Sequence, residues 1–396
     1  MATEFKKVNI VINRIGISFL KLYFKYKYSI TYDNRDLNNV EPPYLILPNH
    51  VNNLDPFFVG AFVKEPIYFV TSDEQFRNPV KGFLLSKLTG AIPKKKFVPD
   101  IITVKDIIRI VKNKGIVGIF PEGQRNWDGE TQELVRSTAK LIKMLEIPVV
   151  TVILSGSHLA HPRWANNNRK GKVHLKYEYT FTPEDIKNMS ADEIDKELSD
   201  KLNYDEYEQQ KKVMNTYTAH NLAESLELFL FTCPQCKSIG TMQSKGNVFY
   251  CNKCNYTVIY NKYGFFDKIT DEPLFTYPNP WNKWQIGNLI QLIEKEEDTD
   301  HIILRDDKVT VSVGSSLKPL INMYYGTIFL NKIYLYIENL DNQIIPFEVS
   351  KMLGLNVQYN DQFEFYYNEQ LFRFRFDNTT ISAYKWTEAL NFLHGK

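Results

Sequence analysis

Apolar residues recur at alternating spacings of three and four near the start of the chain. They are Phe5, Val8, Ile12, Ile15, Phe19, Leu22 and Tyr26. This spacing places one apolar stripe along a helix, so we expect a helix over residues 4–28. Lysines and an arginine lie on or beside the stripe, and Glu4 is the only acid of the segment. Such a helix can lie in the headgroup region of an anionic membrane, or it can pack on a domain core with its lysines in solvent.

Apolar runs and helical patterns then alternate as far as residue 177. Short apolar runs predict buried strands at residues 44–47, 67–71, 90–93, 116–120, 147–153 and 171–177. Helical periodicity predicts helices at residues 57–63, 76–88 and 101–114. This alternation predicts an α/β domain with a mixed sheet flanked by helices, and ligands bind such sheets at the loops that follow the strands.

The pattern changes twice in the second half. Ser190 and Glu193 form a capping box before an acidic helix, and residues 185–206 are expected to present a solvated face. From His301 onward apolar and polar residues alternate, with hairpin turns predicted at residues 306–308 and 367–370. A final helix is predicted over residues 382–393. Strands closed by one helix that carries a tryptophan are similar to a pleckstrin-homology-like barrel, which would dock lipid or protein or serve as an accessory domain.

Composition adds limits to this outline. A chain of 396 residues with 43% hydrophobic and 24% charged residues is expected to fold as two or three domains, and a net charge of +2 makes any basic character local. The N-terminus does not have the pattern of a signal peptide, and no run of about 18 apolar residues predicts a membrane span. All four cysteines lie between Cys233 and Cys254, which favours a reducing compartment over a disulfide scaffold.

A histidine and a carboxylate lie five residues apart after the strand predicted at residues 44–47. On one continuous helix His50 and Asp55 would point about 140° apart and could not meet. Pro48 and the Asn-Asn and Asp-Pro pairs predict a loop entering a helix, with Asn53 or Asp55 as its N-cap. A turn there would let Asp55 orient His50 as a general base. A surface loop in which Asp55 only caps the helix fits the same residues.

A second candidate loop follows the strand predicted at residues 116–120 and reads Phe-Pro-Glu-Gly-Gln-Arg. Arg125 presents a planar fork that suits a phosphate, and Gly123 lets backbone N–H groups approach an anion closely. Glu122 could hold a substrate hydroxyl or fix the loop. An ordinary strand-end turn with a structural Glu–Arg pair is the alternative.

Four blocks in order make residues 20–225 resemble the glycerolipid acyltransferases, and most closely the lysophosphatidic acid (1-acyl-sn-glycerol-3-phosphate) acyltransferases of bacterial type. The blocks are Asn49-His50 with Asp55, Gly90-x-Ile92-Pro93 with a following lysine, Phe120 to Gly123 with Arg125, and the strand Pro148 to Val152. Each block alone is weak evidence, whereas four in this order and spacing are specific.

The chain also departs from the family pattern. The basic residue of the second block is a lysine where arginine is common. Asn52 and Asn126 stand where serines are frequent, and Gln124 stands where a threonine is frequent. These departures leave the His50 and Asp55 pair intact and affect the expected preference for donor and acceptor.

The resemblance implies acyl transfer from a thioester, either acyl-CoA or acyl-carrier protein, to the free hydroxyl of lysophosphatidic acid. His50 would be the base and Asp55 its orienting partner. The residues implied for binding the phosphate-bearing acceptor are Lys94, Lys95, Lys96, Glu122, Gly123 and Arg125. No catalytic cofactor is implied, and the enzyme would sit peripherally on the cytoplasmic face of an anionic membrane. Glycerol 3-phosphate or another lysolipid is an alternative acceptor, and a non-catalytic membrane-docking scaffold is an alternative function.

Two Cys-x-x-Cys pairs, Cys233 with Cys236 and Cys251 with Cys254, are separated by fourteen residues. Four thiolates at this spacing predict a structural zinc site in a zinc ribbon. Redox dithiols are the alternative, although a redox site rarely needs two such pairs. No dense Arg and Lys surface accompanies the ribbon, so we expect no nucleic-acid partner.

The expected organisation therefore has four parts. They are an amphipathic helix at residues 1–30, an acyltransferase domain at 31–225, a zinc ribbon at 226–272 and a β-rich domain at 273–396.

Overall fold

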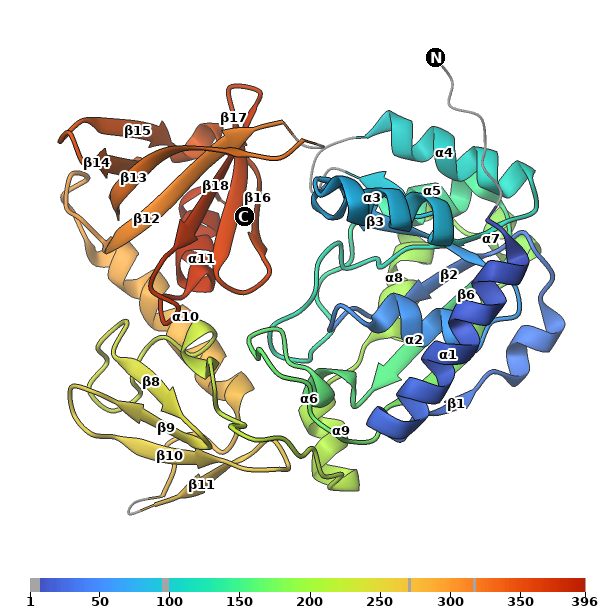
Figure 1. Ribbon diagram of the computed structural model, residues 1–396, viewed down its shortest axis with the longest axis horizontal. Coiled ribbons are helices and arrows are strands. Elements are labelled where there is room, and N and C mark those ends of the chain that lie inside the picture. The colour runs from blue at the N-terminus through green and yellow to red at the C-terminus, as the bar shows by residue number, and fades with distance from the viewer. Residues whose placement is uncertain (1–7, 95–99, 270–271, 316–317, 396) are drawn as a thin grey trace. The chain divides into compact units, whose positions relative to one another are not determined.

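The computed structural model describes residues 8–94, 100–269, 272–315 and 318–395, which form two compact units (Figure 1). Among these residues, the N-terminal unit comprises 8–94, 100–163 and 167–218. The C-terminal unit comprises 164–166 and the residues from 219 onward.

A seven-stranded mixed sheet forms the centre of the N-terminal unit, with the order β1-β7-β6-β2-β5-β3-β4. The strands are β1 (Thr31–Asp33), β2 (Leu45–Pro48), β3 (Ile67–Ser72), β4 (Ile92–Lys94), β5 (Ile116–Gly118), β6 (Val149–Ser155) and β7 (His174–Phe181). Neighbours run parallel except β6 and β7. Every residue of β2 is buried, because a central parallel strand is covered on both faces. The predicted α/β fold with a mixed sheet is confirmed.

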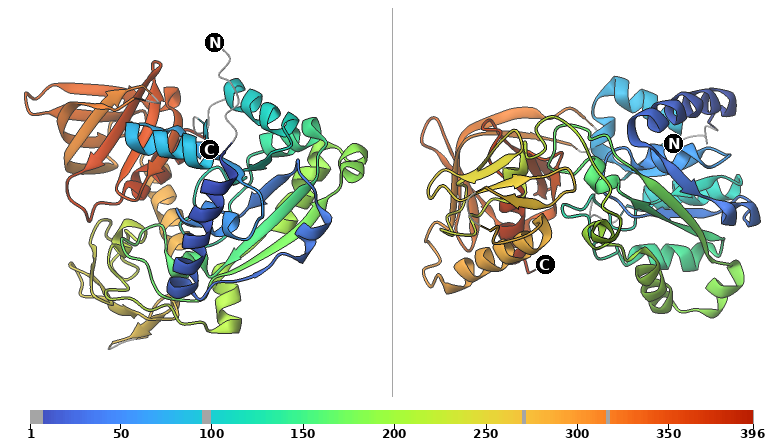
Figure 2. Two further views of the ribbon diagram at one scale, coloured as in Figure 1. Left: turned by 45° about the vertical axis from the view of Figure 1, so that its right-hand side comes forward. Right: turned by 90° about the horizontal axis from the view of Figure 1, so that it is seen from below.

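Helices cover both faces of this sheet (Figure 2). They are α1 (Ile10–Tyr28), α2 (Asp55–Ala61), α3 (Pro79–Leu84), α4 (Ile101–Lys112), α5 (Ser137–Leu145), α6 (Ser157–Ala160), α7 (Pro183–Asn188), α8 (Ala191–Leu202) and α9 (Glu206–Val213). Helices α4, α5, α7 and α8 share one apolar core with β2, β5 and β6. On the opposite face α1 packs on α2, with the rings of Phe24 and Phe58 4.6 Å apart.

The first helix forms but begins at Ile10, and most of its apolar stripe does not pack into the core. Asn9 caps α1 by accepting from two backbone N–H groups, and within α1 only Phe24 and Tyr28 are buried. Phe19, Leu22 and Tyr26 are 73%, 70% and 79% exposed. Val8 is buried in the core, whereas the stripe from Ile12 to Tyr26 is an exposed surface of this unit. Residues 4–7, at the start of the predicted helix, lie outside the described residues.

Three local predictions are wrong. Neither Asn53 nor Asp55 is the N-cap of α2, because Leu54 occupies that position and Asp55 is the first helical residue. The helix predicted at residues 76–88 begins at Pro79, capped by Asn78, and ends in a π-helical turn, η3 (Leu85–Thr89). The hairpin predicted at residues 306–308 is instead an irregularity within one long strand, where the pairing register shifts between Asp306 and Val309. A local excess of polar residues can mark a bulge as well as a turn.

The C-terminal unit contains two antiparallel sheets. The four-stranded sheet consists of β8 (Met242–Lys245), β9 (Val248–Cys251), β10 (Thr257–Tyr260) and β11 (Phe266–Lys268). The seven-stranded sheet consists of β12 (Leu304–Gly314), β13 (Ile321–Leu330), β14 (Tyr334–Asn339), β15 (Ile344–Glu348), β16 (Leu353–Gln358), β17 (Gln362–Tyr367) and β18 (Gln370–Phe376). The predicted hairpin between β17 and β18 is confirmed.

In the described part of this unit, two α-helices accompany these sheets, α10 (Pro278–Lys295) and α11 (Ala383–Leu393). Trp386 of α11 is fully buried and packs on Phe363 of β17, which confirms the expected β-rich domain closed by a helix. The capping box at Ser190 and Glu193 is also confirmed. Among the described residues, no helix combines the length and hydropathy needed to span a membrane.

Candidate active site

Three neighbouring strands of the N-terminal sheet deliver the loops of the candidate site. Strand β2 lies between β6 and β5, and all three run parallel. Their carboxyl ends therefore meet at one edge of the sheet, where ligands of α/β folds bind. The loop after β2 carries His50, the loop after β5 carries Glu122 and Arg125, and the turn after β6 carries Ser157.

The structure brings His50 and Asp55 together. His50 Nδ1 lies 2.9 Å from Asp55 Oδ2, and the same oxygen accepts from the backbone N–H groups of Val51 and Asn52 at 2.7 and 2.8 Å. Asp55 is fully buried. The imidazole stacks on the ring of Phe120, with 4.0 Å between the centroids. The alternative in which Asp55 only caps a helix is therefore wrong, because its carboxylate turns back toward His50.

Glu122 fixes the loops that carry the candidate residues. Its Oε1 accepts from His50 N–H at 2.5 Å, and its Oε2 accepts from Gln132 N–H at 3.0 Å and from Asn126 Nδ2 at 3.4 Å. Asn126 N–H donates in turn to the carbonyl of His50 at 3.0 Å. Glu122 is 3% exposed, and burial raises its pKa to about 8 although these N–H groups oppose the rise. Glu122 thus joins the loops after β2 and β5.

The basic residues lie around this pair of loops. Gly123 is exposed, with a φ of +72°, and Arg125 is half-buried. The guanidinium of Arg163 lies 4.5 Å from the ring centroid of Trp127 and donates to the carbonyl of Arg125. Burial, assisted by the charges of Arg125 and Arg169, lowers the pKa of His161. The positive charge of Arg125 therefore acts on His161.

Lys94, the first residue of the lysine run, lies at the edge of the sheet. Lys94 ends β4, the edge strand, and burial lowers its pKa. Strands β5 and β3 separate β4 from β2, so its backbone is about 14 Å from that of β2 at usual strand spacing. Lys95 and Lys96 lie outside the described residues.

Sequence reasoning gave no part in positioning Asp55 to three residues that the fold places against it or its surroundings, Asn52, Ser157 and Glu206. Ser157 Oγ donates to Asp55 Oδ1 at 2.9 Å, and Asn52 Nδ2 donates to Ser157 Oγ at 2.6 Å. Glu206 of α9 accepts from the N–H of Gly156 with both oxygens, at 2.9 and 2.8 Å. The one available signal for Ser157 was its position directly after a predicted strand, but the pairing of that strand with β2 is not visible in the sequence.

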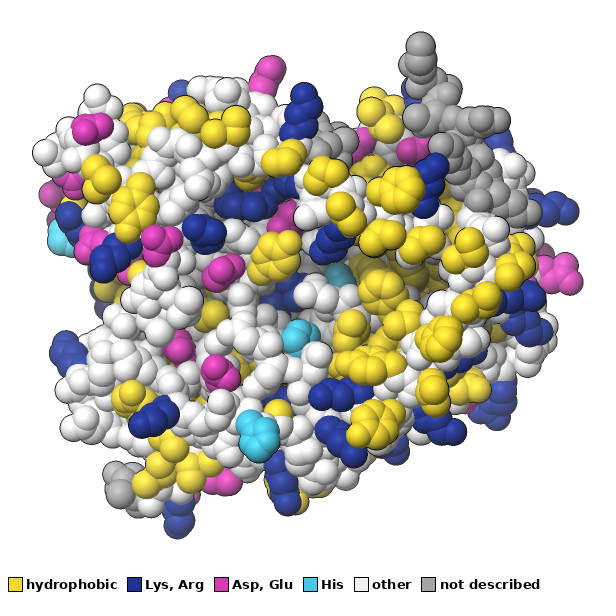
Figure 3. All heavy atoms as spheres, in the orientation of Figure 1, with side chains coloured by type: hydrophobic (Ala, Val, Ile, Leu, Met, Phe, Trp, Pro, Cys, Tyr) yellow, Lys and Arg dark blue, Asp and Glu magenta, His cyan; other side chains and the backbone are white. Residues whose placement is uncertain are grey.

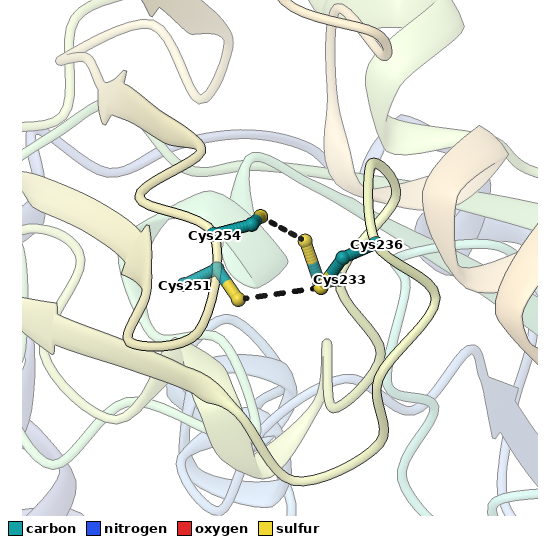
Figure 4. A group of neighbouring side chains, drawn as sticks. All are labelled: Cys233, Cys236, Cys251 and Cys254. Atoms are coloured by element: carbon teal, nitrogen blue, oxygen red, sulfur yellow. Dashed lines mark hydrogen bonds between the residues drawn. The ribbon is translucent and has the colours of Figure 1, made fainter.

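The four cysteines converge in the C-terminal unit (Figure 4). Their sulfur atoms all lie within 4.8 Å of one another, and Sγ–Sγ distances are 3.6 Å for Cys233 and Cys254 and 3.7 Å for Cys236 and Cys251. Four sulfurs at about 2.3 Å from a tetrahedral zinc ion are about 3.8 Å apart. The cluster therefore fits a metal ion of this kind.

Comparison with protein families supports the resemblance of the N-terminal unit to acyltransferases. Residues 29–155 match the family model described as Acyltransferase, a stretch that holds His50, Asp55, Glu122 and Arg125. The chain therefore contains a stretch that is similar to the Acyltransferase family.

Individual relatives carry a more specific name. A 1-acyl-sn-glycerol-3-phosphate acyltransferase of Limnanthes alba is 26% identical over 153 residues, which are 38% of this chain and 53% of the relative. One of Saccharomyces cerevisiae is 30% identical over 139 residues, or 33% of this chain and 45% of the relative. The chain thus spans about half the length of these relatives. The crystal structure of the 1-acyl-sn-glycerophosphate (LPA) acyltransferase PlsC of Thermotoga maritima matches with a TM-score of 0.43 and 18% identity, covering 51% of this chain and 80% of that one.

Proposed function

We propose that this protein transfers a fatty acyl group from a thioester donor to the free hydroxyl of lysophosphatidic acid, giving phosphatidic acid. The observation that carries the proposal is the His50 and Asp55 pair, 2.9 Å apart at the carboxyl end of the central strand β2, within a stretch that matches the Acyltransferase family. The names of the relatives support lysophosphatidic acid as the acceptor.

In the proposed reaction His50 takes the proton of the acceptor hydroxyl. Asp55 faces Nδ1, so the other ring nitrogen, Nε2, is the one that accepts this proton. The hydroxyl oxygen bonds to the acyl carbon, the carbon–sulfur bond breaks, and the imidazolium returns the proton to the leaving thiolate. The buried carboxylate of Asp55 stabilises the imidazolium, and a base positioned in this way contributes about 100- to 10,000-fold. No acyl-enzyme and no catalytic cofactor are needed.

We assign the phosphate of the acceptor to Arg125, the backbone at Gly123 and the lysine run of residues 94–96. Arg125 is half-buried and Gly123 is exposed, so both can meet a ligand from solvent. A guanidinium fork binds phosphate in a fixed orientation, which places the adjacent hydroxyl beside His50. Glu122, whose oxygens already bind three N–H groups, acts by fixing the loops.

The acceptor is a lipid, and we propose that the N-terminal unit meets it on an anionic membrane surface at the cytoplasmic face. Figure 3 shows hydrophobic side chains gathered over α1 and α3 with lysines and arginines beside them. The most exposed apolar residues of these two helices, each at least 60% exposed, are Val11, Phe19, Leu22, Tyr26, Val80 and Phe83. Basic helices with such a face bind at the headgroup level.

Vesicle binding tests this surface. We expect Phe19→Ser with Leu22→Ser to weaken sedimentation with vesicles that contain an anionic phospholipid. Leu340 is 76% exposed and belongs to the C-terminal unit, so Leu340→Ser is the matched control and should sediment like the unaltered protein. Equal sedimentation of all three proteins would remove the membrane surface from the proposal.

For the C-terminal unit we propose a structural zinc ion at the four cysteines. We also propose the four-part division into residues 1–30, 31–225, 226–272 and 273–396. The Sγ–Sγ distances support the metal, and the two separate sheets of the C-terminal unit support a ribbon beside a β-rich domain.

The deciding experiment incubates the purified protein with acyl-CoA or acyl-carrier protein and a panel of acceptors, beside His50→Ala. We expect phosphatidic acid from lysophosphatidic acid and none from the variant. Preference for glycerol 3-phosphate or another lysolipid would change the acceptor and keep the mechanism. Turnover that survives in His50→Ala would overturn the mechanism, and no transfer from any donor would favour a membrane-docking scaffold.

A further inference from the structure

The two oxygens of the Asp55 carboxylate have partners from different parts of the chain. Oδ2 is bound locally by His50 Nδ1 and by two backbone N–H groups of the same loop. Oδ1 accepts from the hydroxyl of Ser157, 102 residues away on the turn after β6. The local partners hold one oxygen, and the distant serine fixes the plane of the carboxylate.

Ser157 is itself oriented by Asn52. An ionised carboxylate only accepts hydrogen bonds, so the single hydroxyl proton of Ser157 goes to Asp55. The serine oxygen then accepts from Asn52 Nδ2 at 2.6 Å, and Nδ2 also donates to the carbonyl of Ser157 at 3.1 Å. Asn52 Oδ1 accepts from Leu54 N–H at 2.6 Å, so the amide is oriented at both ends. Asn52, Ser157 and Asp55 are all fully buried.

The turn that carries Ser157 is fixed by the backbone of Gly156 and by hydrogen bonds to Glu206. Gly156 has a φ of +78°, and a Cβ there would lie 2.2 Å from the carbonyl oxygen of Lys172, so only glycine fits. Both carboxylate oxygens of Glu206 accept from the Gly156 N–H. Ser157 therefore has little freedom to move away from Asp55.

From these contacts we infer that Asn52 and Ser157 are positioning residues for the reaction: Asn52 orients Ser157, which fixes the Asp55 carboxylate against His50. The inference rests on the proposed function, in which His50 is the base. Neither residue needs to touch the substrate. Asn52, which departs from the serine frequent in the family, gains a role as the first member of this hydrogen-bonded chain.

The test combines turnover with proton NMR. A proton on imidazole Nδ1 held by a carboxylate gives a far-downfield signal, and His50→Ala identifies which signal belongs to His50. Ser157→Ala should shift or broaden that signal and lower kcat by about 10-fold or more with KM little changed, because small misplacements of a catalytic group cost up to about 100-fold. Asn52→Ala should act in the same direction and serves if Ser157→Ala does not fold.

A matched control separates positioning from general loss of a buried hydroxyl. Thr151 lies on β6, is 2% exposed, and shares a hydrogen bond of 2.8 Å with Thr180. It sits near the opposite end of β6 from Ser157. Thr151→Val should leave both the His50 signal and kcat unchanged.

The outcomes are distinct for the two proposals. If the unaltered protein transfers no acyl group, the proposed function fails, and the His50 signal in Ser157→Ala still decides whether the serine positions the imidazole. If transfer occurs but Ser157→Ala keeps its kcat, the inference is overturned, whether or not the signal moves. A signal and kcat that change together in both variants support it.

Discussion

The His50 loop of the N-terminal unit and the cysteine cluster of the C-terminal unit both gather polar side chains in the interior, but they are completed differently. Each oxygen of Asp55 binds donors supplied by the chain itself. The four sulfurs of the cluster face one another, and thiolates so close together repel unless a cation lies between them. The first site is complete within the protein, whereas the second would be completed by the zinc ion that we propose.

This difference predicts how each site fails. A site built from internal hydrogen bonds loses activity when one partner is changed and keeps its surroundings folded. A site built around an ion loses its local fold when the ion leaves, because binding and folding are linked.

Metal removal has the largest expected effect. Structural zinc contributes about 10–16 kcal/mol in small zinc domains, so a chelator should unfold the four-stranded sheet. Metal analysis should find one zinc per chain, and thermal unfolding with and without chelator measures the loss. Re-addition of zinc should restore the fold and magnesium should not, because thiolates prefer the softer ion. A metal-free protein with an unchanged melting profile would show that the cysteines need no ion.

Asp55→Asn tests the internally completed site. The amide keeps the shape of the carboxylate but lacks the charge that stabilises the imidazolium, so kcat should fall by about 100- to 10,000-fold while the protein stays folded. Steady-state kinetics and circular dichroism measure the two effects. Asp36, which accepts from Tyr179 N–H at 3.2 Å, provides the control Asp36→Asn. If Asp55→Asn unfolds the protein, the two sites do not differ in the way they fail.

The pH dependence of stability tests the support beneath Ser157. Burial raises the pKa of Glu206 from 4.5 to about 7. Between these values the unfolded chain has lost the proton that the folded protein retains, so the free energy of unfolding should fall as pH rises from about 4.5 to 7 and then level off. Glu206→Gln should remove about 3 kcal/mol of that fall. Urea unfolding at pH 5 and pH 8 measures the free energy of unfolding of both proteins. If it changes equally with pH in the unaltered protein and in Glu206→Gln, the raised pKa of Glu206 is refuted.

Arg125→Ala is expected to have the smallest effect. Hydrogen bonds to a charged partner contribute about 1.5–3 kcal/mol, so KM for lysophosphatidic acid should rise by about 10- to 100-fold with a smaller change in kcat. A monoacylglycerol acceptor has no phosphate and should show no such rise. The exposed Arg136 supplies the control Arg136→Ala. An unchanged KM for lysophosphatidic acid in Arg125→Ala would show that Arg125 does not bind the phosphate.

Much of the N-terminal fold followed from local patterns. The strands at β2, β5 and β6 are short apolar runs, and their burial on both faces explains why no alternation marks them. His50 and Asp55 were found because they lie five residues apart across one turn. Ser157 and Glu206 were not, because their place beside that loop depends on strand pairing across about 100 residues. The N-cap of α2 was misassigned because the Asp55 carboxylate binds His50 and Ser157 and does not cap the helix.

In the C-terminal unit too, local features were predicted from the sequence and long-range contacts were not. The spacing of the cysteines alone predicts their cluster. Asp306, in contrast, was predicted to lie in a turn but lies inside β12. Its carboxylate accepts from Lys385 Nζ and Trp386 Nε1, both at 2.7 Å, which are on α11. A polar residue whose partner is distant in the chain carries no local mark of its role.

The parallel arrangement of β6, β2 and β5 also has a kinetic consequence. His50, Glu122 and Ser157 meet only after strands far apart in sequence have paired, and contacts of such long range form slowly during folding. Regain of turnover after dilution from denaturant should therefore lag behind regain of helical signal. For this protein, enzymatic activity would serve as a late reporter of chain assembly.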